Sequence, residues 1–180
     1  QFAEKLRSPF VKIGLELDLF NDGHLLLAPE DLDSDWDIFI GAVHAIQDFV
    51  PGQTSQQEAE RLFLRDVERL LEHDIDVLAH PFRFFKRNRL KVPSHLFATL
   101  AGLLADNGVA AEINFHTYQP ETPFIRQCAE KGVKIALASD THDLAEAGEF
   151  WPHVNVLRQA GITPKMFPET LFTFQGDNAP

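Results

Sequence analysis

The chain has 180 residues, of which 44% are hydrophobic and 24% charged, and this suits one globular domain spanning residues 1–180. Its formal net charge of −11 argues against a general nucleic-acid binder, because such proteins need a basic face. No apolar run is long enough to cross a membrane, no signal peptide is recognisable, and the single cysteine, Cys128, excludes a disulfide framework, so we expect a cytoplasmic protein.

The first part of the chain predicts two strands, each with a potential metal ligand. In residues 11–19 apolar and polar residues alternate, which predicts a strand with Glu16 on its polar side. The apolar run 38–43 predicts a second strand, which ends in His44. A capping box at residues 55–58 opens a helix that extends to about residue 73.

The second half continues the alternation of strands and helices. A short strand at residues 75–79 ends in His80, and a strand at 109–113 ends near Glu112 and Asn114. Residues 135–138 form a further apolar run that precedes Asp140 and His142. Further helices are expected at residues 94–108, 123–131 and 144–160, the last bent or interrupted by Pro152. Such alternation predicts parallel strands joined by crossovers, and hence an α/β layer or barrel.

Ligand-type side chains therefore lie at the ends of four predicted strands, and Glu16 lies on a fifth. Because the carboxyl ends of parallel strands form the floor of the active site in βα folds, these residues are expected to meet there. The candidate ligands are Glu16, His44, His80, Asp140 and His142, with Glu112 and Asn114 nearby.

The spacing of these residues resembles the polymerase and histidinol phosphatase family, usually called PHP. The resemblance runs from about residue 11 to residue 148 and rests on five pieces in the family's order. They are IGLE with Glu16, FIGAVH with His44, DVLAHPFR with His80, VAAEIN with Glu112 and Asn114, and LASDTHDLAEAG with Asp140 and His142. The resemblance implies a distorted (β/α)7 barrel, similar to a TIM barrel, with up to three divalent ions at its mouth.

In that family Glu16 would match a carboxylate that bridges two ions, and the other four candidates would match further ligands. Imidazole and carboxylate without thiolate suit Zn²⁺, Mn²⁺ or Fe. The implied activity is that of a phosphatase in which a metal-bound hydroxide hydrolyses a small phosphate monoester. Two alternatives stay open: a non-catalytic PHP module that serves assembly or regulation, and a metal-dependent nuclease or phosphodiesterase.

The chain departs from the family pattern at its start. The family has a His-x-His at the end of its first strand, and this chain contains none. We therefore expect the N-terminal strands of the barrel to lie outside these 180 residues, either on a further part of the same chain or on a separate segment that completes the barrel in the working protein.

Several further residues near the predicted site are candidates for supporting roles or for substrate contact. Glu112 is expected to support the site through hydrogen bonds, while Asn114 and His116 are candidates for substrate contact. A basic and aromatic loop is expected at residues 82–91. Its segment 83–91 holds five of the sixteen basic residues, and Arg83 is the best candidate to bind phosphate; a solvated loop without this role is the alternative. The remaining histidines are expected on the surface: His24, His73, His95 and His153.

Overall fold

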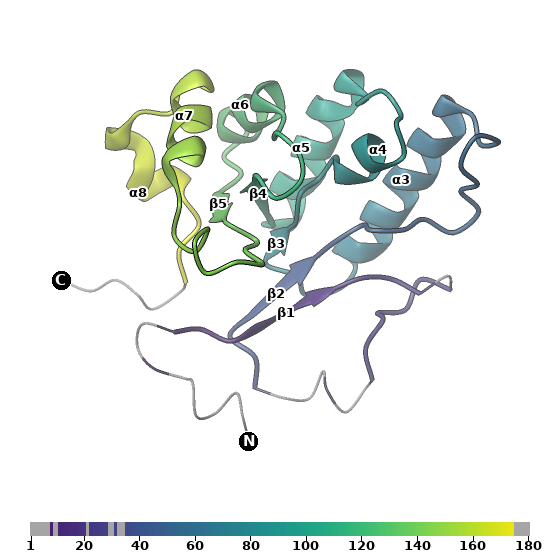
Figure 1. Ribbon diagram of the computed structural model, residues 1–180, viewed down its shortest axis with the longest axis horizontal. Coiled ribbons are helices and arrows are strands. Elements are labelled where there is room, and N and C mark those ends of the chain that lie inside the picture. The colour runs from purple at the N-terminus through teal and green to yellow at the C-terminus, as the bar shows by residue number, and fades with distance from the viewer. Residues whose placement is uncertain (1–7, 9–10, 21, 29–30, 32–34, 175–180) are drawn as a thin grey trace.

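The computed structural model describes residues 8, 11–20, 22–28, 31 and 35–174 and shows an α/β fold (Figure 1). One five-stranded parallel sheet runs through it, with the strands in sequence order from β1 to β5. The strands are β1 (Gly14–Leu17), β2 (Ile38–Gly41), β3 (Val77–Leu78), β4 (Ala110–Asn114) and β5 (Ile135–Ala138). Their registers pair Glu16 with Ile40 and Glu112 with Ala136, which brings all five carboxyl ends to one edge.

Among the described residues, helices connect β2 to β3, β3 to β4 and β4 to β5, and the helices stand in a row along the sheet (Figure 1). They are α3 (Gln56–Leu71), α4 (Arg83–Arg87), α5 (Phe97–Asn107), α6 (Thr122–Glu130), α7 (Trp151–Gln159) and α8 (Phe167–Thr170), with short 3-10 turns at η1 (Ser94–Leu96) and η2 (Pro164–Met166). A doubly wound sheet would reverse its strand order at a switch point, and these strands follow one another without reversal. The consecutive order is compatible with part of a β/α barrel.

Helix α3 forms where the capping pattern predicts it. The hydroxyl of Ser55 accepts a hydrogen bond from the Glu58 amide at 3.2 Å, which satisfies one of the free amides of the first turn. The helix then buries an apolar stripe that includes Leu62, Phe63 and Val67 against the sheet. Burial of this stripe fixes the chain between β2 and β3.

Phenylalanine rings from the segment after β3 pack against rings from helices α3, α5 and α6. The ring of Phe82 lies 4.9 Å from that of Phe97 and 5.0 Å from that of Phe124, measured between centroids. Phe63 and Phe85 make a similar edge contact at 5.0 Å. Aromatic pairs at this separation contribute roughly 0.5–1.5 kcal/mol each beyond their buried area, so they hold the segment after His80 firmly.

The structure corrects the predicted helix at 144–160. Residues 141–150 form an exposed turn-rich loop, and helix α7 begins only at Trp151, with Pro152 in its first turn. Proline has no amide hydrogen and its fixed φ suits the first helical positions, so it starts this helix instead of bending it.

Two further predictions were wrong. The segment after His80 is not a loop throughout, because residues 83–87 form the short helix α4, in which Phe84 and Phe85 are buried. His153 is not on the surface but is 1% exposed. It lies against Phe115 and donates from Nε2 to the carbonyl of Ala138 at 2.8 Å. Cys128 is buried.

No helix among the described residues combines the length and the apolar character needed to cross a membrane.

Candidate metal centre

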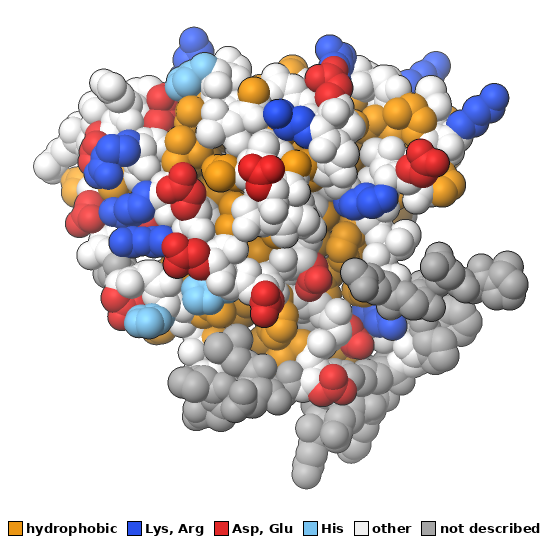
Figure 2. Space-filling model, turned by 180° about the vertical axis from the view of Figure 1, so that it is seen from behind, with side chains coloured by type: hydrophobic (Ala, Val, Ile, Leu, Met, Phe, Trp, Pro, Cys, Tyr) orange, Lys and Arg blue, Asp and Glu red, His pale blue; other side chains and the backbone are white. Residues whose placement is uncertain are grey.

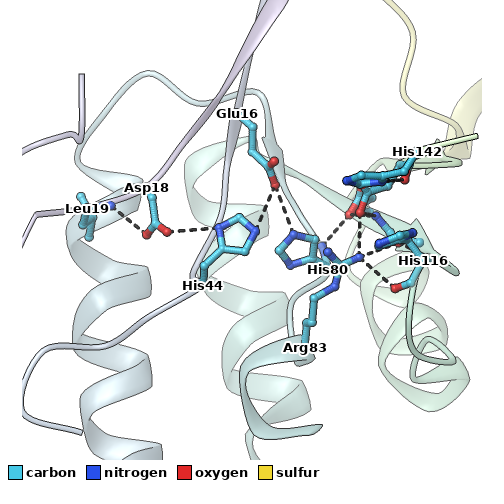
Figure 3. Close-up of polar contacts among 11 residues, drawn as sticks. Glu16, Asp18, Leu19, His44, His80, Arg83, His116 and His142 are labelled. Atoms are coloured by element: carbon cyan, nitrogen blue, oxygen red, sulfur yellow. Dashed lines mark hydrogen bonds and ion pairs between the residues drawn. The ribbon is translucent and has the colours of Figure 1, made fainter. Parts of the chain in front are cut away.

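Glu16, His44 and His80 come together at the carboxyl edge of the sheet (Figure 3). Their ligand atoms all lie within 4.8 Å of one another. The Nε2 atom of His80 is 3.2 Å from Oε1 of Glu16, and Nε2 of His44 is 3.7 Å from the same oxygen. Two imidazoles from neighbouring strand ends therefore face one carboxylate oxygen.

Asp18 fixes the orientation of His44, and the sequence analysis did not assign it a role. Its Oδ2 lies 3.1 Å from Nδ1 of His44, so the ring donates from Nδ1 and turns Nε2 toward Glu16. Its Oδ1 accepts the Leu19 amide at 2.9 Å, which holds the carboxylate in place. A signal was present: in the alternating strand, Asp18 falls two residues after Glu16 and so on the same face.

The three cluster residues differ in the direction of their pKa shifts. The hydrogen bond to Asp18 raises the pKa of His44 above its ordinary value. Burial lowers the pKa of His80, whose side chain is only 6% exposed, so its imidazole favours the neutral form that binds metals. The hydrogen bond from His80 lowers the pKa of Glu16, which keeps this carboxylate charged.

Glu112 supports the backbone of His80 through a hydrogen bond. Its Oε2 accepts the backbone amide of His80 at 2.6 Å and the side-chain amide of Asn114 at 3.2 Å. The backbone of His80 has a φ of 30°, in the left-handed region that non-glycine residues rarely adopt, and the bond from Glu112 helps to hold it there. Burial raises the pKa of Glu112 to about 7. Its two hydrogen bonds are contacts of the kind expected for a residue that supports the site.

Arg83 lies at the centre of a second group of polar side chains. Its Nη2 donates to Oδ1 of Asn114 at 2.7 Å, to Oδ2 of Asp140 at 2.9 Å and to the carbonyl of His116 at 3.2 Å. Asn114 also donates to Asp140 at 3.2 Å, so Arg83, Asn114 and Glu112 form one network that reaches His80. Burial raises the pKa of Asp140, but the hydrogen bonds from Arg83 and Asn114 outweigh it and lower the pKa overall.

Asp140 and His142 lie apart from the three-residue cluster. Asp140 has a φ of 46° and an ion pair with Arg83, so its carboxylate already faces a cation. The side chain of His142 is 70% exposed, and its ring stacks on that of His116 at a centroid distance of 4.3 Å. Figure 3 shows the two groups side by side, with Arg83 and His80 between Glu16 and His142.

Both groups border one open pocket of about 380 Å³. Its walls include four of the five candidate ligands and two arginines: Glu16, His44, Arg83, Arg87, His116, Thr117, Tyr118, Asp140 and His142. The fifth candidate, His80, does not line this pocket, but its Nε2 lies 3.2 Å from Oε1 of Glu16, which does. The structure thus places four of the five candidate ligands and Arg83 around one pocket, with His80 in contact with Glu16.

The donor set of the cluster fits a divalent cation. Ligand atoms about 2.1 Å from a tetrahedral ion lie about 3.4 Å apart, close to the two distances measured from Glu16 Oε1. Two imidazoles and one carboxylate also form a donor set found in catalytic zinc sites, and they suit manganese and iron as well. Glu16, His44 and His80 could therefore hold one metal ion.

A scan of the chain against protein-family models found no match, and a search of the curated proteins found no similar sequence.

Proposed function

We propose that this chain is a metal-dependent phosphoesterase that hydrolyses a small phosphate monoester. The observation that carries the proposal is the cluster of Glu16, His44 and His80 next to a pocket that Glu16, His44 and Arg83 line. The consecutive parallel sheet supports the further proposal that the domain is part of a distorted (β/α)7 barrel of the PHP type.

Each residue of the site has a task in this reaction. Glu16, His44 and His80 would hold the divalent ion, while Asp18 and Glu112 keep the two histidines in position. When bound, such an ion supplies Lewis-acid polarisation of phosphoryl oxygens and lowers the pKa of water. Arg83 faces the same pocket, where its planar guanidinium can donate to the non-bridging oxygens of a phosphate.

The size and charge of the pocket favour a small substrate. A pocket of about 380 Å³ holds a small phosphate ester and cannot enclose a nucleic-acid strand. On the face that Figure 2 shows, basic side chains of the described residues are interspersed with acidic ones and form no continuous basic stripe. These features disfavour the nuclease alternative.

One observation favours the non-catalytic alternative. The ion pair between Arg83 and Asp140 occupies a carboxylate that the PHP resemblance assigns to the metal-ligand set. A PHP-type module without catalytic activity could keep this ion pair as a purely structural contact. Metal content and turnover must therefore be measured together.

The test is metal analysis of the full protein together with hydrolysis of p-nitrophenyl phosphate in the presence of Mn²⁺ or Zn²⁺. We expect bound metal and turnover in the wild type, and loss of both in His80→Ala, because that change removes one of three donors. The control is His95→Ala, which removes an exposed imidazole remote from the pocket and is expected to retain both. Bound metal without turnover in the wild type would favour the non-catalytic module, and turnover that survives His80→Ala would refute the assigned roles.

A further inference from the structure

Arg87 is a second arginine on the wall of the candidate pocket, four residues after Arg83 on helix α4. Residues at this spacing lie on the same face of a helix, with Cα atoms about 6 Å apart along the axis. Both guanidinium groups thus border one space, at different distances from the metal cluster. Arg83 lies within the hydrogen-bonded network, whereas Arg87 is exposed at the rim.

Arg87 differs from its basic neighbours because its side chain has no acidic partner among the described residues. Arg83 is paired with Asp140, and the neighbouring Lys86 is paired with Glu121 at 2.6 Å. No hydrogen bond or ion pair of the Arg87 side chain is found with any residue that the structure describes. A guanidinium in this state can bind an anion without first breaking an internal contact.

Helix α4 holds the two arginines in fixed relative positions. Phe84 and Phe85 are 2% and 0% exposed and anchor the helix in the aromatic core. The side chain of Asn88 donates to the carbonyl of Phe84 at 2.8 Å and closes the helix end next to Arg87. Rigid support of this kind lowers the cost of ordering a binding residue.

We propose that Arg87 binds a second anionic group of the substrate, so that the pocket selects short phosphorylated compounds with a carboxylate or another phosphate. This inference rests on the proposed function, since it takes Arg83 and the metal cluster to receive the scissile phosphate. If the two guanidinium groups keep the roughly 6 Å separation of their Cα atoms, they match two anionic groups joined by a spacer of about two to four bonded atoms. A basic residue placed only to stabilise the carboxyl end of α4 would show no such preference.

The first test compares the binding of two phosphonates, which cannot be hydrolysed because their C–P bond is stable. The ligands are 3-phosphonopropanoate and propylphosphonate, which have the same chain length and differ by one carboxylate. With Mn²⁺ present, calorimetry on the wild type is expected to give a Kd at least about tenfold lower for 3-phosphonopropanoate. In Arg87→Gln this preference is expected to fall to about twofold or less. Propane-1,3-bisphosphonate then shows whether a phosphate is preferred to a carboxylate.

The matched control is Lys91→Gln, which removes the same charge from an exposed residue outside the pocket. It is expected to keep the tenfold preference. Equal binding of the two phosphonates by the wild type, a preference that survives Arg87→Gln, or an equal loss in Lys91→Gln would each overturn the inference.

Turnover separates this inference from the proposed function. The kcat/KM for 3-phosphoglycerate is expected to exceed that for glycerol 3-phosphate, and Arg87→Gln is expected to reduce this ratio about tenfold. Hydrolysis of both esters without a preference would leave the phosphoesterase standing and reject the role of Arg87. A binding preference that depends on Arg87, without any hydrolysis, would support the anion site and reject the phosphoesterase. If neither phosphonate binds, both are rejected.

Discussion

Glu112 is the buried carboxyl group that links the two halves of the site. Both of its hydrogen bonds, from the His80 amide and from Asn114, end on the same oxygen, Oε2. A glutamine could accept both with its single carbonyl oxygen, so Glu112→Gln removes the ionisation while keeping the geometry.

This arrangement makes the stability of the wild type depend on pH. Burial raises the folded-state pKa from 4.5 to about 7, so between these pH values the folded protein binds a proton that the unfolded chain has lost. The contribution of Glu112 to stability is fully present below pH 4.5 and is lost as the pH rises through about 7. Relative to Glu112→Gln, we expect the wild type to lose up to about 3 kcal/mol of unfolding free energy across this range.

Urea denaturation at a series of pH values measures this difference. Glu130→Gln, a change at an exposed position on α6, is the control and should differ from the wild type by a constant amount at every pH. A constant difference for Glu112→Gln as well would show that Glu112 ionises normally in the folded protein.

Asp18 is a positioning residue for the candidate metal ligand His44. In Asp18→Asn the amide oxygen can still accept from Nδ1, but the negative charge that polarises the ring is lost. Loss of such a partner typically weakens metal binding 10- to 100-fold, so we expect the Kd for Zn²⁺ to rise by at least about tenfold. Calorimetric titration measures this effect, with the exposed Asp106→Asn as control. An unchanged Kd would mean that His44 does not bind the ion or does not need Asp18.

At the scale of the elements, β2 reaches the site because Gly41 lets it pass close to α3. A Cβ atom at Gly41 would lie 2.6 Å from Cδ1 of Ile75 and 2.8 Å from Cδ2 of Leu70, well inside normal contact distance. His44 follows three residues later, so this close approach also sets where one candidate ligand leaves the sheet. On the other side of β2, Gly14 of β1 pairs with Ile38, and a Cβ atom at Gly14 would lie 2.4 Å from the carbonyl oxygen of Ile38.

We therefore expect Gly41→Ala to lower the free energy of unfolding by about 1–3 kcal/mol, the usual cost of overpacking a core. Urea denaturation provides the measurement. Gly102→Ala is the matched control, because nothing lies within 4 Å of its added Cβ and alanine favours the helix, so it should be neutral or stabilising by up to about 1 kcal/mol. If Gly41→Ala were as stable as the wild type, Leu70 and Ile75 would have to move aside without strain.

Helix α4 shows how one short element serves both the core and the site. Its aromatic residues, Phe84 and Phe85, enter the core, and its basic residues, Arg83 and Arg87, border the pocket. The sequence RFFKR was predicted as part of a loop, because five residues are too short for a periodic pattern to be read. In the structure, Phe84 and Phe85 pack into the core and the segment is helical.

For the molecule as a whole, a metal ion that binds only the folded state must stabilise it. At a free concentration 100 times the Kd, the gain is about 2.7 kcal/mol, which for a domain of this size raises Tm by about 5–10 °C. We expect this shift on addition of Mn²⁺ or Zn²⁺, reversed by EDTA, in thermal unfolding followed by circular dichroism. The shift should be absent in His80→Ala and present in His95→Ala. An equal shift in His80→Ala would place the ion elsewhere.

The sequence by itself determined the alternation of strands and helices, the cap of α3 and the residues that follow each strand. These features depend on neighbours in the chain: apolar periodicity, capping residues and the length of buried runs. For that reason Glu16, His44 and His80 could be named before their positions were known. The predicted extent of the last long helix was wrong because Pro152 can begin a helix as well as interrupt one.

Only the tertiary structure determined which of these residues lie close together and which lie apart. It placed Glu16, His44 and His80 in one cluster, tied Asp140 to Arg83, buried His153 and brought Asp18 to His44. Each of these contacts joins residues from different strands or helices, and its distance is set by how the sheet and helices pack. Periodicity along a chain carries no information about such distances, whereas the register of five parallel strands fixes them.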